Sequence, residues 1–163
     1  MKRVVIMRGL SGSGKSTFAS EIACESEHAV IVSADHFFEI GLNREYHFDV
    51  MKLGKAHQAC FRNFMEAVDD GVELIIVDNT NSSDMEISPY YLAGESFGYD
   101  VSILEIVCDA ELAASRNSHG VPRGTIVKMA ERMAKGSLPP WWKVNCRNAE
   151  HDPVDLVVDF SEI

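Results

Sequence analysis

Near the N-terminus the sequence reads Gly9-Leu-Ser-Gly-Ser-Gly-Lys-Ser16, with Thr17 directly after it. This stretch fits G-x-x-x-x-G-K-[ST], the pattern of a phosphate-binding loop, or P-loop. The valine- and isoleucine-rich run Lys2–Arg8 before it predicts a strand, and residues 14–25 after it predict a helix. Glycines let the loop turn its backbone N–H groups inward, and the start of a helix adds positive potential. The loop therefore predicts a binding site for the phosphates of a nucleotide.

The side chains of the loop indicate the phosphates of a nucleotide and Mg²⁺ as its ligands. Lys15 is expected to reach the β- and γ-phosphates, which gives it a catalytic role, and the Ser16 hydroxyl is expected to ligate Mg²⁺. The expected nucleotide-binding residues of the loop are Gly12, Ser13, Gly14, Lys15, Ser16 and Thr17.

Beyond the loop, apolar strands alternate with helices. Strands are expected at residues 2–8, 29–33, 72–77, 101–107 and 156–160, and helices at 14–25, 50–68, 85–97, 109–117 and 125–135. Residues 41–49 are polar and are expected to form a loop. Several strands are apolar throughout, which is typical of a parallel sheet with helices on both faces. The predicted fold class is α/β, a three-layer α/β/α sandwich of the P-loop NTPase type with a mostly parallel sheet.

Length and composition fit one soluble domain. With 163 residues, 46% of them hydrophobic, we expect residues 1–163 to form a single P-loop domain, with a helical lid at about 116–135. No apolar run approaches the roughly 18 residues of a membrane span, and the N-terminal run is too short for a signal peptide. We expect a cytoplasmic protein with no membrane partner; the sequence carries no signal of its oligomeric state. The four cysteines lack CxxC spacing, which disfavours a zinc site or a disulfide framework.

The charge is distributed unevenly. The formal net charge is −10, which argues against a general nucleic-acid binder. Residues 63–115 contain no lysine or arginine, whereas residues 116–147 contain seven of them against one acid, Glu131. Such a segment suits contact with a polyanion, such as nucleotide phosphates or the end of a nucleic-acid strand. A solvated helix face explains the same pattern equally well.

Acidic and amide side chains follow two of the predicted strands. Asp78 ends the apolar run Leu74–Val77 and is a candidate ligand of Mg²⁺ or of its waters, or a residue that orients the acceptor. Asn79 and Asn81 offer hydrogen bonds to a hydroxylated substrate. Asp35 lies just past the second strand, where a carboxylate can accept the proton of an attacking hydroxyl. Turn formation or helix capping is the competing explanation for these residues.

Arg116 and Arg123 enclose the segment Asn117–Pro122. In a phosphoryl-transfer enzyme, cationic side chains that close over the nucleotide stabilise the transferring charge, and nearby glycines let such a lid move. A pair of surface arginines is the alternative. His57, on the long predicted helix, is a candidate acceptor-site residue, although a packed or surface histidine is commoner. Trp141-Trp142 is either a base-stacking platform or an apolar clamp on the core.

Five blocks carry a resemblance to a known family. They are Gly9–Thr17, Val32–Phe38, Ala56-His57, Val77–Asn81 and Arg116–Arg123. In this order they resemble the P-loop polynucleotide 5′-hydroxyl kinases, most closely the kinase-like domain of ubiquitin-ligase-binding proteins and more distantly bacteriophage polynucleotide kinase. The resemblance covers about residues 3–135.

The resemblance implies a reaction and a role for each residue. ATP would be the donor, and its γ-phosphoryl group would pass to a 5′-hydroxyl of DNA or RNA. Asp35 would be the general base, and Arg116 and Arg123 would be the lid arginines. Lys15 and Ser16 would lie at the phosphates and Mg²⁺, and Asp78 would help to shape the acceptor site.

Two positions depart from the phage pattern. His36 and Phe38 stand where the phage enzyme has an acid and an arginine that holds the phosphate of the acceptor. A polynucleotide would find one cationic group fewer here, and the negative net charge points the same way. Two alternatives therefore stay open: a nucleoside or other small-molecule kinase, and an ATP-binding module without transfer activity.

Overall fold

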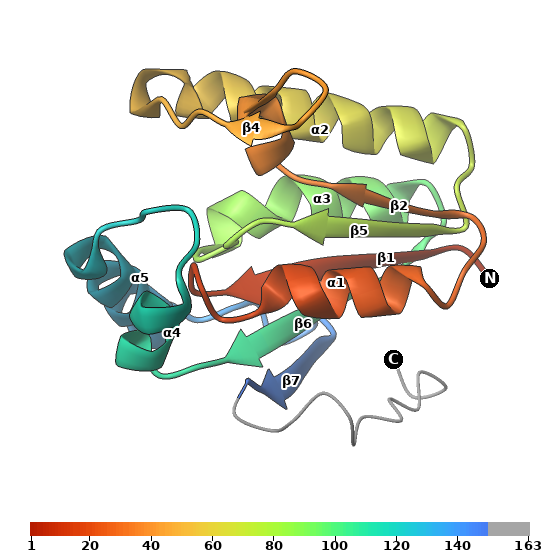
Figure 1. Cartoon of the computed structure of the whole chain (residues 1–163). Coiled ribbons are helices and arrows are strands. Elements are labelled where there is room, and N and C mark those ends of the chain that lie inside the picture. Colours follow the sequence, from red (N-terminus) through yellow and green to blue (C-terminus); the bar gives the residue numbers. More distant parts are fainter. Residues whose placement is uncertain (150–163) are drawn as a thin grey trace.

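A parallel sheet of five strands, in the order β2-β5-β1-β6-β7, forms the centre of the computed structural model, which describes residues 1–149 (Figure 1). The strands are β1 Arg3–Gly9, β2 Ala29–Val32, β5 Leu74–Asp78, β6 Asp100–Val107 and β7 Val144–Asn148. The helices are α1 Lys15–Ala23, α2 Leu53–Asp69, α3 Asp84–Ser96, α4 Ala110–Arg116 and α5 Arg123–Lys135. No helix within residues 1–149 is long and apolar enough to cross a membrane.

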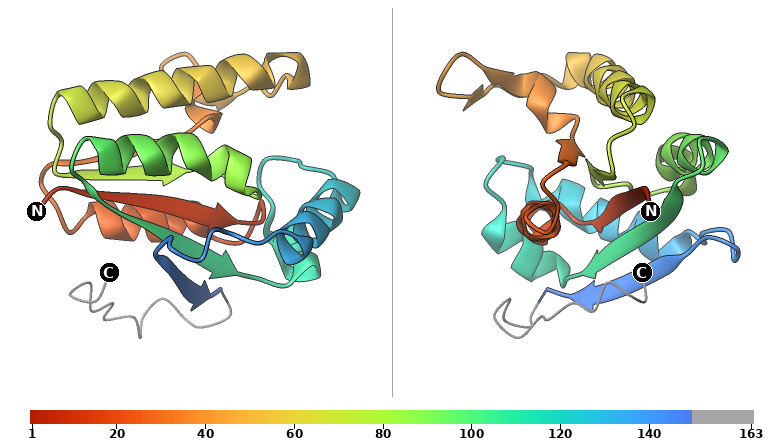
Figure 2. Two further views of the ribbon diagram at one scale, coloured as in Figure 1. Left: turned by 180° about the vertical axis from the view of Figure 1, so that it is seen from behind. Right: turned by 90° about the vertical axis from the view of Figure 1, so that its right-hand side faces the viewer.

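Helices cover both faces of the sheet. Successive side chains of a strand point to opposite faces, and in β1 Val4 and Ile6 pack on the side of α2 and α3, while Val5 and Met7 pack against α1. Figure 2 shows α1 on one side of the sheet and α2 and α3 on the other. The predicted three-layer α/β/α architecture is therefore confirmed, and the apolar character of the central strand follows from burial on both sides.

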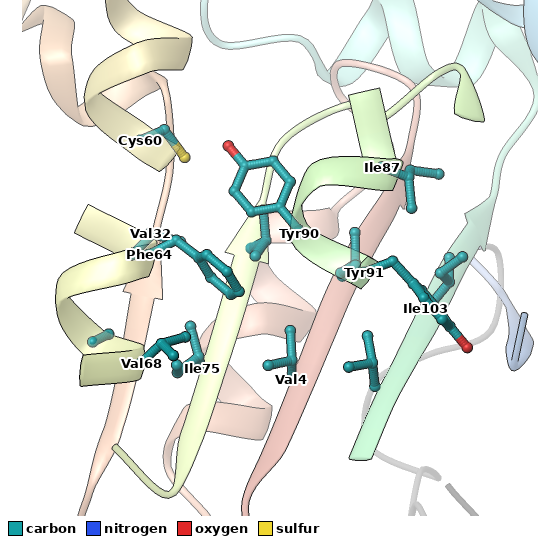
Figure 3. Packing of buried hydrophobic residues seen from close by; sticks show 14 of the residues in the cluster. Val4, Val32, Cys60, Phe64, Val68, Ile75, Ile87, Tyr90, Tyr91 and Ile103 are labelled. Atoms are coloured by element: carbon teal, nitrogen blue, oxygen red, sulfur yellow. The ribbon is translucent and has the colours of Figure 1, made fainter. Parts of the chain in front are cut away.

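Aromatic rings fill the layer between the sheet and the helices α2 and α3 (Figure 3). Phe64 of α2 meets Tyr90 of α3 edge to face at 5.2 Å between ring centroids. Tyr91 stacks on Trp142 at 4.8 Å, and Trp142 is buried whereas Trp141 is 75% exposed. Of the two expectations for the tryptophan pair, the apolar clamp therefore describes Trp142.

The helices α4 and α5 lie beyond the carboxyl ends of the strands and bury a small apolar cluster of their own. Leu10 of the P-loop, Ala113 of α4 and Ile126 of α5 form its buried centre. Asp109 caps α4 as predicted, since its side chain accepts hydrogen bonds from the N–H groups of the second and third residues after it. The region expected to form the lid thus packs directly on the P-loop.

Two expectations about secondary structure need correction. Residues 41–49 are not merely a loop, because β3 Glu39–Ile40 pairs with β4 Glu45–Tyr46 in a short antiparallel hairpin. The edge strand β7 was not predicted, because Val144–Asn148 contains few apolar residues and owes its strand conformation to pairing with β6. The strand expected at 156–160 lies outside the described residues. The other predicted elements are present with ends shifted by a few residues.

Candidate active site

A cavity of about 590 Å³ opens at the carboxyl edge of the sheet. It is lined by residues 11–18, Glu21, Asp35, residues 78–80, residues 116–119 and Ala149. The fold therefore brings together the P-loop, the end of β5, the 3₁₀-helix Asp35–Phe38 that follows β2, and the loop between α4 and α5. This is the edge at which open α/β sheets bind their ligands.

The P-loop adopts a backbone that only glycine accommodates easily. Gly12 and Gly14 have φ values of 84° and 94°, in the left-handed region. A Cβ atom on Gly12 would lie 2.0 Å from the carbonyl oxygen of Ala113 in α4, whereas one on Gly14 would meet nothing within 4 Å. Gly12 therefore provides close packing between the loop and the lid, and Gly14 provides only the turn.

This difference predicts unequal effects of two matched substitutions. Gly14→Ala should lower the free energy of unfolding by roughly 1–2 kcal/mol through backbone strain alone. Gly12→Ala should lower it by at least about 2 kcal/mol more, because the new methyl group displaces α4 as well. Urea unfolding of both variants measures the difference. Equal reductions would contradict the close packing of the loop against α4.

Lys15 places a cationic group inside the cavity. Its side chain is buried, and Nζ donates a hydrogen bond to the carbonyl oxygen of Leu10 at 2.7 Å. Burial lowers the pKa of Lys15, while the charges of Asp78 and Asp35 act in the opposite direction. The site therefore holds an ammonium group that has been stripped of most of its water and gains from an anionic ligand.

The Ser13 hydroxyl is a buried polar group without a hydrogen-bond partner among residues 1–149. An unpaired buried hydroxyl is destabilising by about 1–3 kcal/mol, so such groups mark places where a ligand or water completes the bonding. Ser13 lines the cavity between two loop glycines. A phosphate oxygen in the loop would satisfy this donor, so the residues present fit a nucleotide.

Ser16 and Asp78 supply oxygen atoms on one side of the cavity. Burial raises the pKa of the Asp78 carboxyl, while a hydrogen bond from Ser16 and the charge of Lys15 act against the rise. A hydroxyl beside a carboxylate is a donor set that suits Mg²⁺, which binds one or two protein oxygens together with substrate phosphates and water. The pair therefore fits the metal predicted from the sequence.

Asp35 lies at the start of the 3₁₀-helix Asp35–Phe38, with a side chain that is 47% exposed at the cavity. The Tyr46 hydroxyl donates a hydrogen bond to Oδ1 of Asp35 at 2.8 Å, and Nδ1 of His119 lies 3.6 Å from Oδ2. Sequence reasoning did not single out either neighbour. Tyr46 stood in a segment expected to be a loop, and His119 stood inside the block Arg116–Arg123 without a role of its own.

The amides of Asn79 and Asn81 hydrogen-bond within the protein. Asn79 accepts a hydrogen bond from the N–H of Ala34 at 2.9 Å and donates to Sγ of Cys60, and Asn81 donates to the carbonyl oxygen of Met7 at 2.6 Å. Asn79 lines the cavity, and Asn81 is buried with a positive φ of 46°. Both residues tie the end of β5 to neighbouring strands, and a substrate contact through them stays a prediction.

The remaining candidates fall into two groups. Arg116 lines the cavity, and its Nη1 lies 3.4 Å from the carbonyl oxygen of Ala149. Among the residues described, Arg123 and His57 do not line the cavity. Arg123 is exposed and pairs with Glu111, with 2.8 Å between Nε and Oε2, and His57 is exposed on α2. An active role for Arg123 would require it to leave Glu111.

Comparison with known proteins identifies a family for this chain and several relatives. A family model described as "AAA domain" matches residues 4–133. Human NEDD4-binding protein 2 is 36% identical over 132 residues, which cover 78% of this chain and 7% of that protein. The chain therefore spans only a small part of the length of this relative.

Solved structures share the fold at low sequence identity. An unliganded sugar kinase from Janibacter sp. HTCC2649 has a TM-score of 0.66 at 21% identity and is matched over 94% of this chain and 89% of its own. The Pnkp1/Rnl/Hen1 RNA repair complex contains a chain with a TM-score of 0.65 at 18% identity, matched over 82% of this chain and 44% of its own. These matches and the family model confirm the predicted resemblance to P-loop kinase domains.

Proposed function

Because this chain belongs to the AAA-domain family, whose model matches residues 4–133, we propose that it is an ATP-dependent kinase for the 5′-hydroxyl end of DNA or RNA. One observation carries the proposal: the half-exposed carboxylate of Asp35 and the buried ammonium group of Lys15 line the same cavity. A phosphoryl transfer needs a base for the acceptor and a cation for the donor within one site.

On the donor side, the chain binds and neutralises the phosphates. The N–H groups of residues 12–16 and the Ser13 hydroxyl bind the phosphate oxygens, and Lys15 stabilises the negative charge that they carry in the transition state. Ser16 and Asp78 would hold Mg²⁺, which supplies further charge neutralisation when it is bound. Arg116 faces the cavity from the lid and adds a second cationic group.

On the acceptor side, Asp35 orients the hydroxyl and takes its proton. The hydroxyl oxygen forms a bond to the γ-phosphorus as the bond between that phosphorus and the oxygen of the leaving ADP breaks, and the proton passes to the Asp35 carboxylate. Positioning and electrostatics supply most of the catalysis in this class of reaction. The roles of Arg123 and His57 are proposed on the motif alone, because neither lines the cavity.

A nucleic-acid acceptor is supported by exposed cations on α5. Ile126 is buried against α4 and the P-loop, whereas Lys128, Arg132 and Lys135 are exposed. Nη1 of Arg132 lies 3.2 Å from the Ser82 hydroxyl, in the connection that leaves β5. Arg132 thus reaches the carboxyl edge of the sheet, and we propose that the three cations contact phosphates of a strand whose end reaches Asp35.

Transfer from γ-labelled ATP tests the proposal. Matched DNA and RNA oligonucleotides with a 5′-hydroxyl or a 5′-phosphate serve as acceptors, with Asp35→Ala as the control enzyme. We expect the wild-type enzyme to label only oligonucleotides with a 5′-hydroxyl end. We expect Asp35→Ala to lose this labelling. ATP binding without label on any strand would reject the nucleic-acid acceptor.

The α5 cations give a second, quantitative prediction. A triple variant in which alanine replaces Lys128, Arg132 and Lys135 should have a KM for an oligonucleotide that is at least several-fold higher. Its KM for ATP should be unchanged. The slope of log KM against log salt concentration should fall by about one for each phosphate that the variant no longer neutralises. Lys2→Ala removes one exposed cation at the amino end of β1, away from α5, and should change neither quantity. An unchanged salt slope in the triple variant would count against a strand on α5.

A small-molecule acceptor is the second candidate, and Phe38 favours it. Phe38 is 2% exposed and packs in the core beside Tyr46, so this position offers no cation to the phosphate of an acceptor. A kinase of this kind would label nucleosides or sugars at a rate that salt hardly changes. An ATP-binding module without transfer activity would label nothing, and its ATP binding would be indifferent to Asp35→Ala.

A further inference from the structure

The two carboxylate oxygens of Asp35 have different surroundings. Oδ1 accepts a hydrogen bond from the Tyr46 hydroxyl at 2.8 Å. Oδ2 lies 3.6 Å from Nδ1 of His119, which is longer than a hydrogen bond. Within residues 1–149, Oδ2 therefore keeps its lone pairs available on the side of the cavity lined by the lid loop.

Tyr46 is itself held in place by the hairpin. It pairs with Glu39 across the β3–β4 ladder, and the next residue, His47, donates its N–H to the carbonyl oxygen of Phe38 at 2.8 Å. The centroid of the Tyr46 ring lies 6.1 Å from that of the buried Phe38 ring. On its other contact, the Tyr46 centroid lies 4.5 Å from that of the His119 ring. The hydroxyl therefore projects from a fixed support toward Asp35.

The hydroxyl is also a permanent donor. A tyrosine hydroxyl is already protonated at neutral pH, and burial and the hydrogen bond to Asp35 raise the pKa of Tyr46 further above its ordinary value. Hydrogen bonds to a charged group are stronger than those between neutral groups. A half-exposed aspartate on a one-turn helix would otherwise rotate freely, and this bond selects one orientation.

We propose that Tyr46 is a positioning residue, whose hydroxyl holds Oδ1 of Asp35 so that Oδ2 receives the proton of the acceptor hydroxyl. The inference rests on the proposed function, because it requires Asp35 to act as the base. Tyr46 acts through Asp35 and touches neither ATP nor the transferred group. Its removal therefore lowers kcat and leaves the binding of ATP intact.

Tyr46→Phe tests the role with little change of shape. We expect kcat for a saturating 5′-hydroxyl oligonucleotide to fall by about tenfold, the usual consequence of removing one hydrogen bond to a charged group, with KM for ATP unchanged. Tyr99→Phe is the matched control. The Tyr99 hydroxyl donates to the carbonyl oxygen of Val72 at 2.9 Å, at the opposite end of the sheet, and its removal should leave kcat unchanged. Thermal unfolding of both variants compares their stability.

The same substitution in an Asp35→Ala background separates positioning from a general structural effect. If Tyr46 acts through Asp35, Tyr46→Phe should change the residual rate of that background by less than about twofold, because the two effects are not additive. A tenfold reduction in both backgrounds, or a kcat for Tyr46→Phe equal to that of Tyr99→Phe, would overturn the positioning role alone. A wild-type chain that labels no 5′-hydroxyl end would overturn the proposed function and this inference with it.

Discussion

Lys15→Ala is expected to lower phosphoryl transfer by roughly a thousandfold or more, the range seen when a group that stabilises transition-state charge is removed. The cause is visible in the environment of Lys15. Burial in the cavity removes water from its ammonium group, which lowers the pKa of Lys15, while the charges of Asp78 and Asp35 favour the charged form. Phosphate oxygens would replace the missing solvation, and the interaction would strengthen as negative charge moves during transfer.

The same substitution should remove the stabilisation by ATP. A ligand that binds only the folded state adds about 2.7 kcal/mol to the free energy of unfolding at a concentration of a hundred times its Kd. Titration of Mg²⁺-ATP should therefore raise Tm for the wild-type chain and barely move it for Lys15→Ala. Lys55→Ala, an exposed lysine on α2, is the charge control and should behave as the wild type. A variant that keeps more than a tenth of the transfer rate would exclude this role for Lys15.

The P-loop, which forms the proposed donor half of the site, is encoded by one short stretch of sequence. The P-loop is a continuous stretch whose neighbours in sequence are also its neighbours in space, and strand, loop and helix follow in the predicted order. Asp78 was predicted as a site residue because it ends the apolar strand β5, and it does line the cavity with Lys15. The motif specifies the P-loop itself, and Asp78 joins it because β5 pairs in parallel with β1.

The proposed acceptor half of the site depends on contacts between distant segments. Tyr46 and His119 reach Asp35 from a hairpin and from the lid, and no spacing rule links these three positions. The hairpin itself was missed, because strands of two residues leave no periodic pattern. The strand β7 was missed for a related reason, since a polar edge strand gains its conformation from its neighbour.

The roles of Asn79 and Asn81 could not be decided from the sequence. The run Asn79-Thr80-Asn81 offers amides to a substrate or to the protein, and composition alone does not separate the two uses. In the structure these amides hydrogen-bond to the backbone of Ala34 and Met7. Buried amides seek such partners because an unpaired one is destabilising. The run therefore fixes the sheet edge on which Asp78 and Asp35 converge.

Asp35→Ala is expected to lower kcat by about 10²- to 10⁴-fold, the usual contribution of a general base, while the rise of Tm with ATP stays as in the wild type. Asp35 lines the cavity with a half-exposed side chain and lies outside the P-loop, so its removal should leave ATP binding intact. A reduced kcat with unchanged ATP binding distinguishes Asp35 from Lys15, whose removal should affect transfer and ATP binding together. Asp69→Ala, an exposed acid at the end of α2, controls for the change of net charge.

Asp35→Asn then separates proton transfer from shape. The amide has nearly the size of the carboxylate, and its oxygen can still accept the hydrogen bond from Tyr46, but it is a poor proton acceptor. If Asp35 works as a base, the Asp35→Asn variant should transfer phosphate almost as slowly as Asp35→Ala. If Asp35 only orients the hydroxyl, Asp35→Asn should recover most of the wild-type rate. Rates of Asp35→Ala or Asp35→Asn above half the wild-type value would reject the base. Transfer would then proceed by positioning and charge stabilisation alone, which the loose transition state of phosphoryl transfer permits.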